Sequence, residues 1–69
     1  MAKVQWETRL GARIKAARKA KGLTLQKAAD TYGCSLRWWQ EMEQGRNVSV
    51  DVLFKLAKVV GIEAWQLIK

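Results

Sequence analysis

The sequence predicts an all-α domain of five short helices. Three observations support this: the 69-residue chain has no proline, its apolar residues recur at intervals of three and four, and no segment alternates apolar and polar residues as a strand does. Four of the five glycines (Gly22, Gly33, Gly45 and Gly61) follow segments with the helical spacing. Glycine readily takes the left-handed conformation at which helices end. A chain of this length makes one domain, which we take as residues 1–69, with an N-terminal tail over residues 1–7.

The first helix is predicted to begin at about Trp6 or Thr8 and to end at Lys21. Its apolar stripe has the expected spacing and consists of Leu10, Ile14 and Ala17. Gly11 lies inside this helix, where glycine lowers helix propensity.

The second and third helices are short and lie close together in sequence. Thr24 is an N-cap for a helix over residues 25–31, and Ser35 is an N-cap for a helix over residues 36–44. Residues 32–34 form a tight turn between them. Trp39 and Met42 lie three residues apart and are expected on the inner face of the third helix.

Ser49 is predicted to cap the fourth helix, which Gly61 ends, and residues 63–68 form a short fifth helix. The apolar stripe of the fourth helix consists of Leu53, Leu56, Ala57 and Val60. Phe54 lies off this stripe and is expected to be partly exposed, where with Val59 and Ile68 it forms a patch suited to a two-fold dimer. Trp6 and Trp65 are interpreted as lids on the core or, alternatively, as dimer contacts.

The charge of the chain favours a polyanionic partner. Its net charge is +7, and seven of the 13 basic residues fall in one stretch without an acidic residue: Arg9, Arg13, Lys15, Arg18, Lys19, Lys21 and Lys27.

The composition argues against several other classes of protein. With one cysteine and no histidine, the sequence offers neither an internal disulfide nor a metal site, and Cys34 is expected to be a half-buried structural residue in a reducing cytoplasm.

No apolar run approaches the roughly 20 residues of a membrane span, and the N-terminus has no apolar signal core. We expect no cofactor or small-molecule ligand. Catalysis is not expected, because Glu41 and Glu43, the one candidate carboxylate pair, diverge on a helix.

The second and third helices have the features of a helix-turn-helix motif over residues 24–44. Ala29 is small where the two helices meet, and Gly33 follows four residues later in the turn. Trp39 and Met42 are the buried positions of the second helix of the motif.

Four stretches together resemble the XRE family, which contains the small phage repressors and Cro proteins. They are Gly22-Leu23-Thr24 through Glu43-Gln44-Gly45, Asn47-Val48-Ser49-Val50, Leu53-x-x-Leu56-Ala57, and residues 61–68. The resemblance covers residues 9–68. It implies a compact five-helix repressor-like fold in which the helix over 36–44 enters the major groove of DNA and the preceding helix crosses the backbone.

The resemblance also implies roles for individual residues. The expected base-reading positions are Ser35, Leu36, Arg37 and Glu41. The expected phosphate contacts are Thr24, Gln26, Lys27, Arg46 and Asn47. A structural ion pair is expected between Arg18 and Glu43.

Several of these positions have an alternative interpretation. Arg37 suits the edge of a guanine, or is a surface arginine lying over Trp38. Leu36 suits a thymine methyl group, or is an ordinary exposed leucine. Glu41 suits cytosine N4, or forms an ion pair with Arg37 four residues earlier. Trp38 is expected at the edge of the core or at the rim that faces DNA.

The sequence therefore predicts a cytoplasmic, nucleoid-associated transcription regulator of bacterial or phage type. We expect it to bind specific double-stranded DNA, to form a homodimer at least on DNA, and to bind no membrane. One alternative is a repressor-like fold that serves as a protein–protein interaction module, suggested by Leu36, Glu41 and the paired tryptophans. Another is a basic domain for a membrane surface or RNA, suggested by Trp6 and the first helix.

Overall fold

The computed structural model describes residues 6–68, with side chains described from residue 9 onward. Over this part of the chain the structure confirms an all-α fold of five helices. They are α1 (Trp6–Lys21), α2 (Leu25–Tyr32), α3 (Leu36–Gln44), α4 (Val50–Val60) and α5 (Ala64–Ile68). Because α1 begins at Trp6, residues 6 and 7 are helical and do not belong to the expected tail. The rest of that tail lies outside the described residues.

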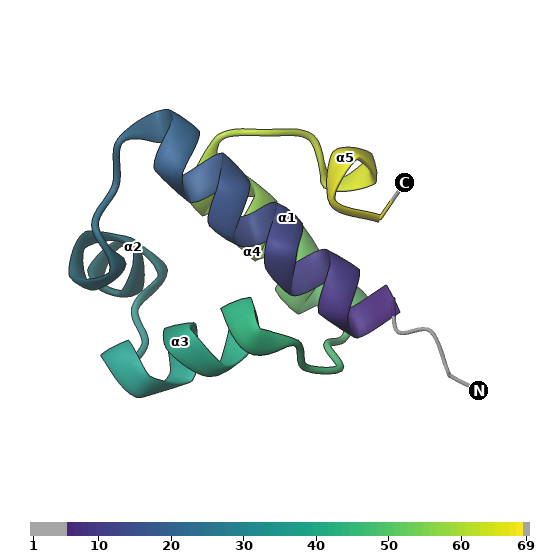
Figure 1. The fold of residues 1–69 in the computed structure, drawn as a ribbon, viewed down its shortest axis with the longest axis horizontal. Coiled ribbons are helices and arrows are strands. Elements are labelled where there is room, and N and C mark those ends of the chain that lie inside the picture. Colours follow the sequence, from purple (N-terminus) through teal and green to yellow (C-terminus); the bar gives the residue numbers. More distant parts are fainter. Residues whose placement is uncertain (1–5, 69) are drawn as a thin grey trace.

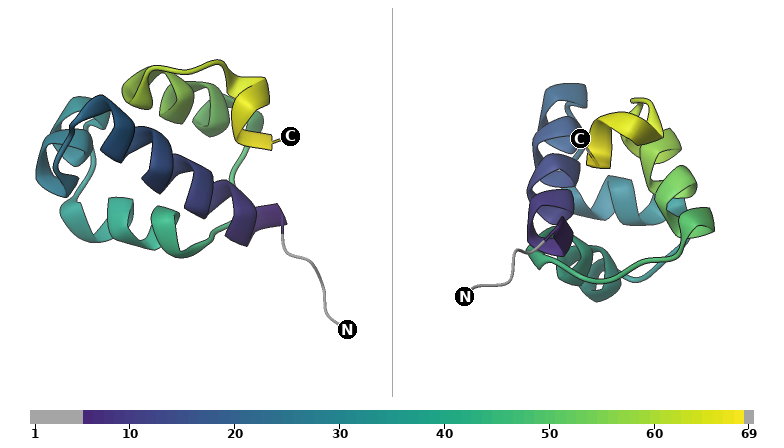
Figure 2. Two further views of the ribbon diagram at one scale, coloured as in Figure 1. Left: turned by 45° about the horizontal axis from the view of Figure 1, so that its top comes forward. Right: turned by 90° about the vertical axis from the view of Figure 1, so that its right-hand side faces the viewer.

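The helices surround a single interior. α1 packs against α3, α4 and α5, while α2 packs against α3 and α4. α3 lies along one side of the domain and α5 lies at the end away from α2 (Figures 1 and 2). None of the described helices is both long and apolar enough to span a bilayer.

Side-chain caps begin three of the helices, as the sequence predicts. Thr24, Ser35 and Ser49 each accept a hydrogen bond from the backbone N–H three residues later, at 3.0, 3.0 and 3.3 Å. Each cap satisfies a backbone donor that the helix itself leaves unpaired, and contributes about 1 kcal/mol to stability.

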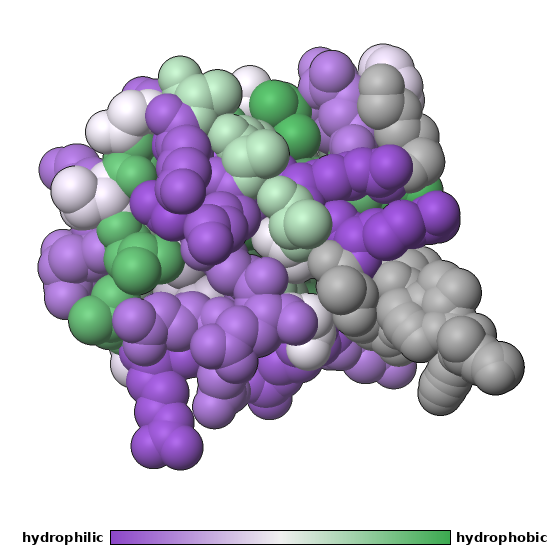
Figure 3. All heavy atoms as spheres, in the orientation of Figure 1, coloured by the Kyte–Doolittle hydropathy of each residue, from purple (hydrophilic) through white to green (hydrophobic). Residues whose placement is uncertain are grey.

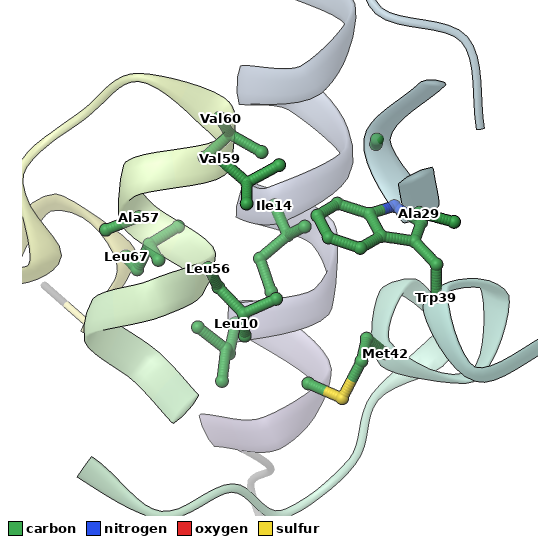
Figure 4. Packing of buried hydrophobic residues seen from close by; sticks show 11 residues of the cluster. Leu10, Ile14, Ala29, Trp39, Met42, Leu56, Ala57, Val59, Val60 and Leu67 are labelled. Carbon is green, nitrogen blue, oxygen red and sulfur yellow. The ribbon is translucent and has the colours of Figure 1, made fainter. Parts of the chain in front are cut away.

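The core draws on all five helices. Its buried residues are Leu10, Ile14, Ala28, Ala29, Trp39, Met42, Leu56, Ala57, Val59, Val60 and Leu67. Figure 4 shows Trp39 reaching from α3 toward α1, with Ala29 of α2 nearby and Leu56 approaching from α4. The predicted inner positions Trp39 and Met42 are fully buried.

Two sequence-based expectations about surface residues are wrong. Val59 is only 5 % exposed and cannot belong to an exposed dimer patch. Three helices pack against α4, so its buried arc is wider than the predicted stripe. Trp65 is more than half exposed and is not a buried lid, whereas Phe54 is exposed as expected. The side chain of Trp6 lies outside the described residues.

Gly11 allows α1 and α3 to approach closely. A Cβ atom at this position would lie 2.6 Å from the carbonyl oxygen of Glu43 and 2.7 Å from that of Met42. These are backbone atoms at the end of α3, so they cannot turn aside as a flexible side chain does. The glycine that lowers the helix propensity of α1 is therefore required by the packing.

The Arg18–Glu43 ion pair lies inside the domain. Arg18 Nε and Nη2 donate to the two carboxylate oxygens of Glu43 at 2.5 and 3.3 Å, and the two side chains are only 8 % and 7 % exposed. Arg18 Nη1 donates to the carbonyl oxygen of Leu23 at 2.8 Å. Trp39 Nε1 donates to the Glu43 carboxylate at 2.7 Å. This network ties α3 to α1 and to the start of the helix-turn-helix.

Candidate nucleic-acid interface

The outer side of α3 is mainly polar, and the inner side packs into the core. At about 100° per residue, an arc of about 140° around α3 contains five residues in the order Leu36, Gln40, Gln44, Arg37 and Glu41. The first four are exposed and Glu41 is half-buried. Trp39 and Met42 point to the opposite side, into the core. The outer surface therefore presents hydrogen-bonding groups that the core contacts do not use.

Of the predicted base-reading residues, Ser35 is the N-cap of α3, Leu36 lies at one edge of this arc, and Arg37 and Glu41 lie toward the other edge. The Ser35 hydroxyl accepts from the N–H of Trp38, which leaves its own O–H available to donate. Leu36 is 37 % exposed, and the Arg37 side chain is 88 % exposed. Arg37 therefore has room to extend away from the domain.

Glu41 is shared between two arginines. Its Oε2 lies 3.5 Å from Arg37 Nε, and its Oε1 accepts from Arg46 Nη1 at 2.8 Å. The ion pair considered as an alternative for Glu41 is thus present, and a second arginine from the loop after α3 joins it.

Arg46 also lies over an aromatic stack. Its guanidinium carbon is 5.8 Å from the centre of the Trp38 ring, and Trp38 stacks on Tyr32 of α2 at 4.9 Å. On Tyr32, the Nζ of Lys55 lies 4.5 Å from the ring centre. Cation–π contacts of this kind attract an arginine to the face of an aromatic ring. Trp38 is half-buried at the edge of the core, one of the two places expected for it.

Two titratable groups lie beside this stack. Burial, followed by the nearby Cys34, raises the pKa of the Tyr32 hydroxyl. Burial raises the pKa of the Cys34 thiol, with Asp30 adding to the effect and Lys55 opposing it. Cys34 is therefore a poorly ionised, half-buried thiol, as expected for a structural residue.

The predicted phosphate contacts fall into two groups. Thr24, Gln26 and Lys27 lie at the start of α2, where Thr24 is the N-cap and Gln26 Nε2 donates to Asp30 at 2.9 Å. Arg46 and Asn47 lie in the loop after α3, where Arg46 pairs with Glu41. Lys27, Arg46 and Asn47 are all exposed. Two of the five, Gln26 and Arg46, are therefore already bonded to other side chains of the domain.

Gln40 and Gln44 are candidate contacts that the sequence interpretation missed. Both are exposed on the same arc as Leu36 and Arg37, and with Lys15 they line a hollow between α1, α2 and α3. Their spacing of four and eight residues from Leu36 was the available signal. The surface around this side of the domain is mainly hydrophilic (Figure 3). Within the described part of the chain, no three His, Cys, Asp or Glu side chains gather as metal ligands.

The capped pair α2–α3, joined by a glycine turn and packed through Ala29 and Trp39, defines a helix-turn-helix protein. The chain belongs to the helix-turn-helix domain family, whose model matches residues 9–64. No curated protein sequence matches the chain.

Solved structures of regulators share this fold. The clp gene regulator ClgR from Corynebacterium glutamicum is 25 % identical with a TM-score of 0.90, covering 97 % of this chain and 87 % of its own. The restriction-modification controller protein C.AhdI from Aeromonas hydrophila is 34 % identical with a TM-score of 0.78, covering 87 % and 92 %. SinR, the master regulator for biofilm formation, was solved in complex with DNA; it is 29 % identical with a TM-score of 0.78, covering 87 % and 98 %.

Proposed function

We propose that this protein is a sequence-specific double-stranded DNA-binding transcription regulator that inserts α3 into the major groove. The observation that carries the proposal is the outer surface of α3, where Arg37, Gln40 and Gln44 project from a helix whose other side is locked into the core. A net charge of +7 favours a polyanion. The similarity to C.AhdI and to SinR, which was solved with DNA, supports the same function.

The residues divide into those that read bases and those that position the domain. Arg37 is suited to guanine, whose O6 and N7 accept two hydrogen bonds from one guanidinium. Gln40 and Gln44 offer amides of the kind that pair with adenine N6 and N7. Ser35 and Leu36, at the start of the helix, lie beside the same base pairs.

Five further residues contact phosphates in this proposal. They are Thr24, Gln26, Lys27, Arg46 and Asn47. The first three are at the start of α2, where the helix dipole favours an anion. Such contacts fix the register of the domain on DNA but carry no sequence information themselves.

We further propose that the protein acts as a homodimer on a palindromic site in the cytoplasm, as a repressor of the XRE type. A single short recognition helix reads few base pairs, and a two-fold dimer doubles the site, with half-sites about one DNA turn apart. Phe54 of α4 and Ile68 of α5 supply exposed apolar surface for the contact. Binding alone accounts for this activity, so the proposal includes no catalysis.

The test begins by selecting duplexes from a random pool with the wild-type protein. Binding of Arg37→Ala and Lys27→Ala to the selected duplex and to a random duplex is then compared at one fixed salt concentration. Arg37→Ala should weaken binding to the selected duplex by about fivefold to hundredfold and leave random binding nearly unchanged. Lys27→Ala should weaken both equally and reduce the salt slope by about one unit.

Two results would contradict the proposal. Equal losses on both duplexes for Arg37→Ala would mean that this arginine supplies only charge and that α3 does not read the bases. A wild-type protein that enriches no sequence from the pool would favour the interaction-module interpretation instead.

A further inference from the structure

The shared carboxylate of Glu41 distinguishes the outer surface of α3 from a simple row of DNA-contacting side chains. An acidic residue at this place is unfavourable for DNA binding by itself, because it repels the phosphates. Its two oxygens are, however, assigned to different arginines: Oε2 faces Arg37 Nε and Oε1 accepts from Arg46 Nη1. Both oxygens of Glu41 thus face an arginine, and a base would have to compete with these two cations for the carboxylate.

The atom that Arg37 uses toward Glu41 is informative. A guanidinium has one Nε–H and two terminal NH₂ groups, and it is the terminal groups that can form a fork on guanine O6 and N7. The contact with Glu41 is made by Nε. It favours conformations of Arg37 that keep Nε beside Glu41, and it does not use the two terminal nitrogens.

The second arginine keeps Glu41 in place. Arg46 holds Oε1 at hydrogen-bond distance and lies over Trp38, which itself stacks on Tyr32 of α2. Glu41 is thus linked through Arg46 to the folded body of the domain, whereas Arg37 is 88 % exposed and has no comparable support. The support runs from the aromatic stack to Arg46, then to Glu41, and finally to Arg37.

We propose that Glu41 is a positioning residue that sets the sequence specificity of the domain by orienting the terminal nitrogens of Arg37 toward a guanine. This inference rests on the proposed DNA-binding function and replaces direct base reading by Glu41. Preorganising a flexible arginine lowers the entropy lost when it binds a base. A random duplex offers phosphates, which an unrestrained Arg37 can reach in many conformations, so the orientation matters only at the selected site.

The variant that tests this inference is Glu41→Gln, which keeps an acceptor for Arg46 and removes the charge that attracts Arg37. Exposed ion pairs are weak, so the ratio of selected-site affinity to random-duplex affinity should fall by about two- to fivefold. Affinity for the random duplex should stay the same or increase, because one negative charge leaves the interface. Glu63→Gln is the matched control. It removes the same charge from the residue that precedes α5, a helix on the other side of the domain from α3, and should leave the ratio unchanged (Figure 1).

A double-mutant cycle separates positioning from a general effect on the fold. In an Arg37→Ala background, Glu41→Gln should cause no further loss of the ratio, because the side chain that Glu41 orients is already gone. The melting temperatures of both single variants are measured alongside, and they should stay close to the wild type because both positions lie at the surface.

The possible results distinguish a failure of the positioning role of Glu41 from a failure of the proposed DNA-binding function. If the wild type discriminates between duplexes but Glu41→Gln keeps the full ratio, or lowers it equally in the Arg37→Ala background, the positioning role is wrong and the proposed function stands. If the wild type prefers no duplex, the proposed function is refuted and the positioning role with it.

Discussion

Removing one partner of the Arg18–Glu43 ion pair should cost this domain a large share of its stability. A chain of 69 residues is expected to be stable by only about 3–10 kcal/mol, at roughly 0.05–0.15 kcal/mol per residue. Removing one partner of a buried pair costs about 3–5 kcal/mol, because the remaining charge stays buried. Both side chains are more than nine-tenths buried, so solvent can do little to replace the lost partner.

The informative substitution is Glu43→Gln. The glutamine has the same shape and still offers one acceptor to Arg18 or to Trp39 Nε1, so we expect a loss near the lower limit, about 3 kcal/mol. For a domain of this size each kcal/mol lowers the melting temperature by about 4–8 °C, which predicts a drop of about 12–24 °C. Thermal unfolding followed by circular dichroism measures this shift.

Two controls make the result specific. Glu63→Gln removes an exposed carboxylate and should change stability by less than about 0.5 kcal/mol. Combining Glu43→Gln with Arg18→Met should restore part of the loss, because no unpaired charge is then buried. A Glu43→Gln protein that melts within 2 °C of the wild type would refute the reasoning, since it would mean that the pair is hydrated or not formed in solution.

Three further predictions follow from single features of the structure. Gly11→Ala should destabilise the domain by about 1–3 kcal/mol in thermal unfolding, although alanine is the better helix former, because its Cβ would overlap α3; a stabilised variant would show that the helices are not in contact. Phe54→Ser should lower the cooperativity of binding to a palindromic duplex in sedimentation and gel-shift assays, without changing the affinity for one half-site. The Cys34 thiol should react with a disulfide reagent at pH 8 several times more slowly in the native protein than in the unfolded chain, because burial raises its pKa and the thiolate is the reacting form.

The elements of this fold could be predicted from sequence because the signals for them are local. The caps Thr24, Ser35 and Ser49 mark helix starts by hydrogen bonds that span three residues, and the glycines mark the ends. The inner positions of α3 were also predictable, since Trp39 and Met42 share one face by spacing alone. Two helix ends differ from the prediction by one residue: α2 ends at Tyr32 and α5 begins at Ala64.

What the sequence could not supply depends on contacts between distant segments. Spacing predicts one buried stripe on α4, but three helices pack against α4, and Val59 is buried although it lies off that stripe. Gly11 has a propensity cost that is visible in sequence, while its benefit exists only where the end of α3 passes α1. The arrangement at Glu41 depends on the path of the loop that brings Arg46 back over Trp38, and no spacing rule describes that path.

On α3, the residues that stabilise the fold differ from those that contact bases in the proposed DNA complex. This separation affects how the sequence preference of such proteins can change. Within this helix Trp39, Met42 and Glu43 contribute to stability, whereas Arg37, Gln40 and Gln44 are exposed. Substitutions at the second group should change which bases are preferred at almost no thermodynamic cost. New target sequences are then accessible by single steps, and a duplicated copy of the gene can acquire a different operator before any compensating change arises elsewhere in the chain.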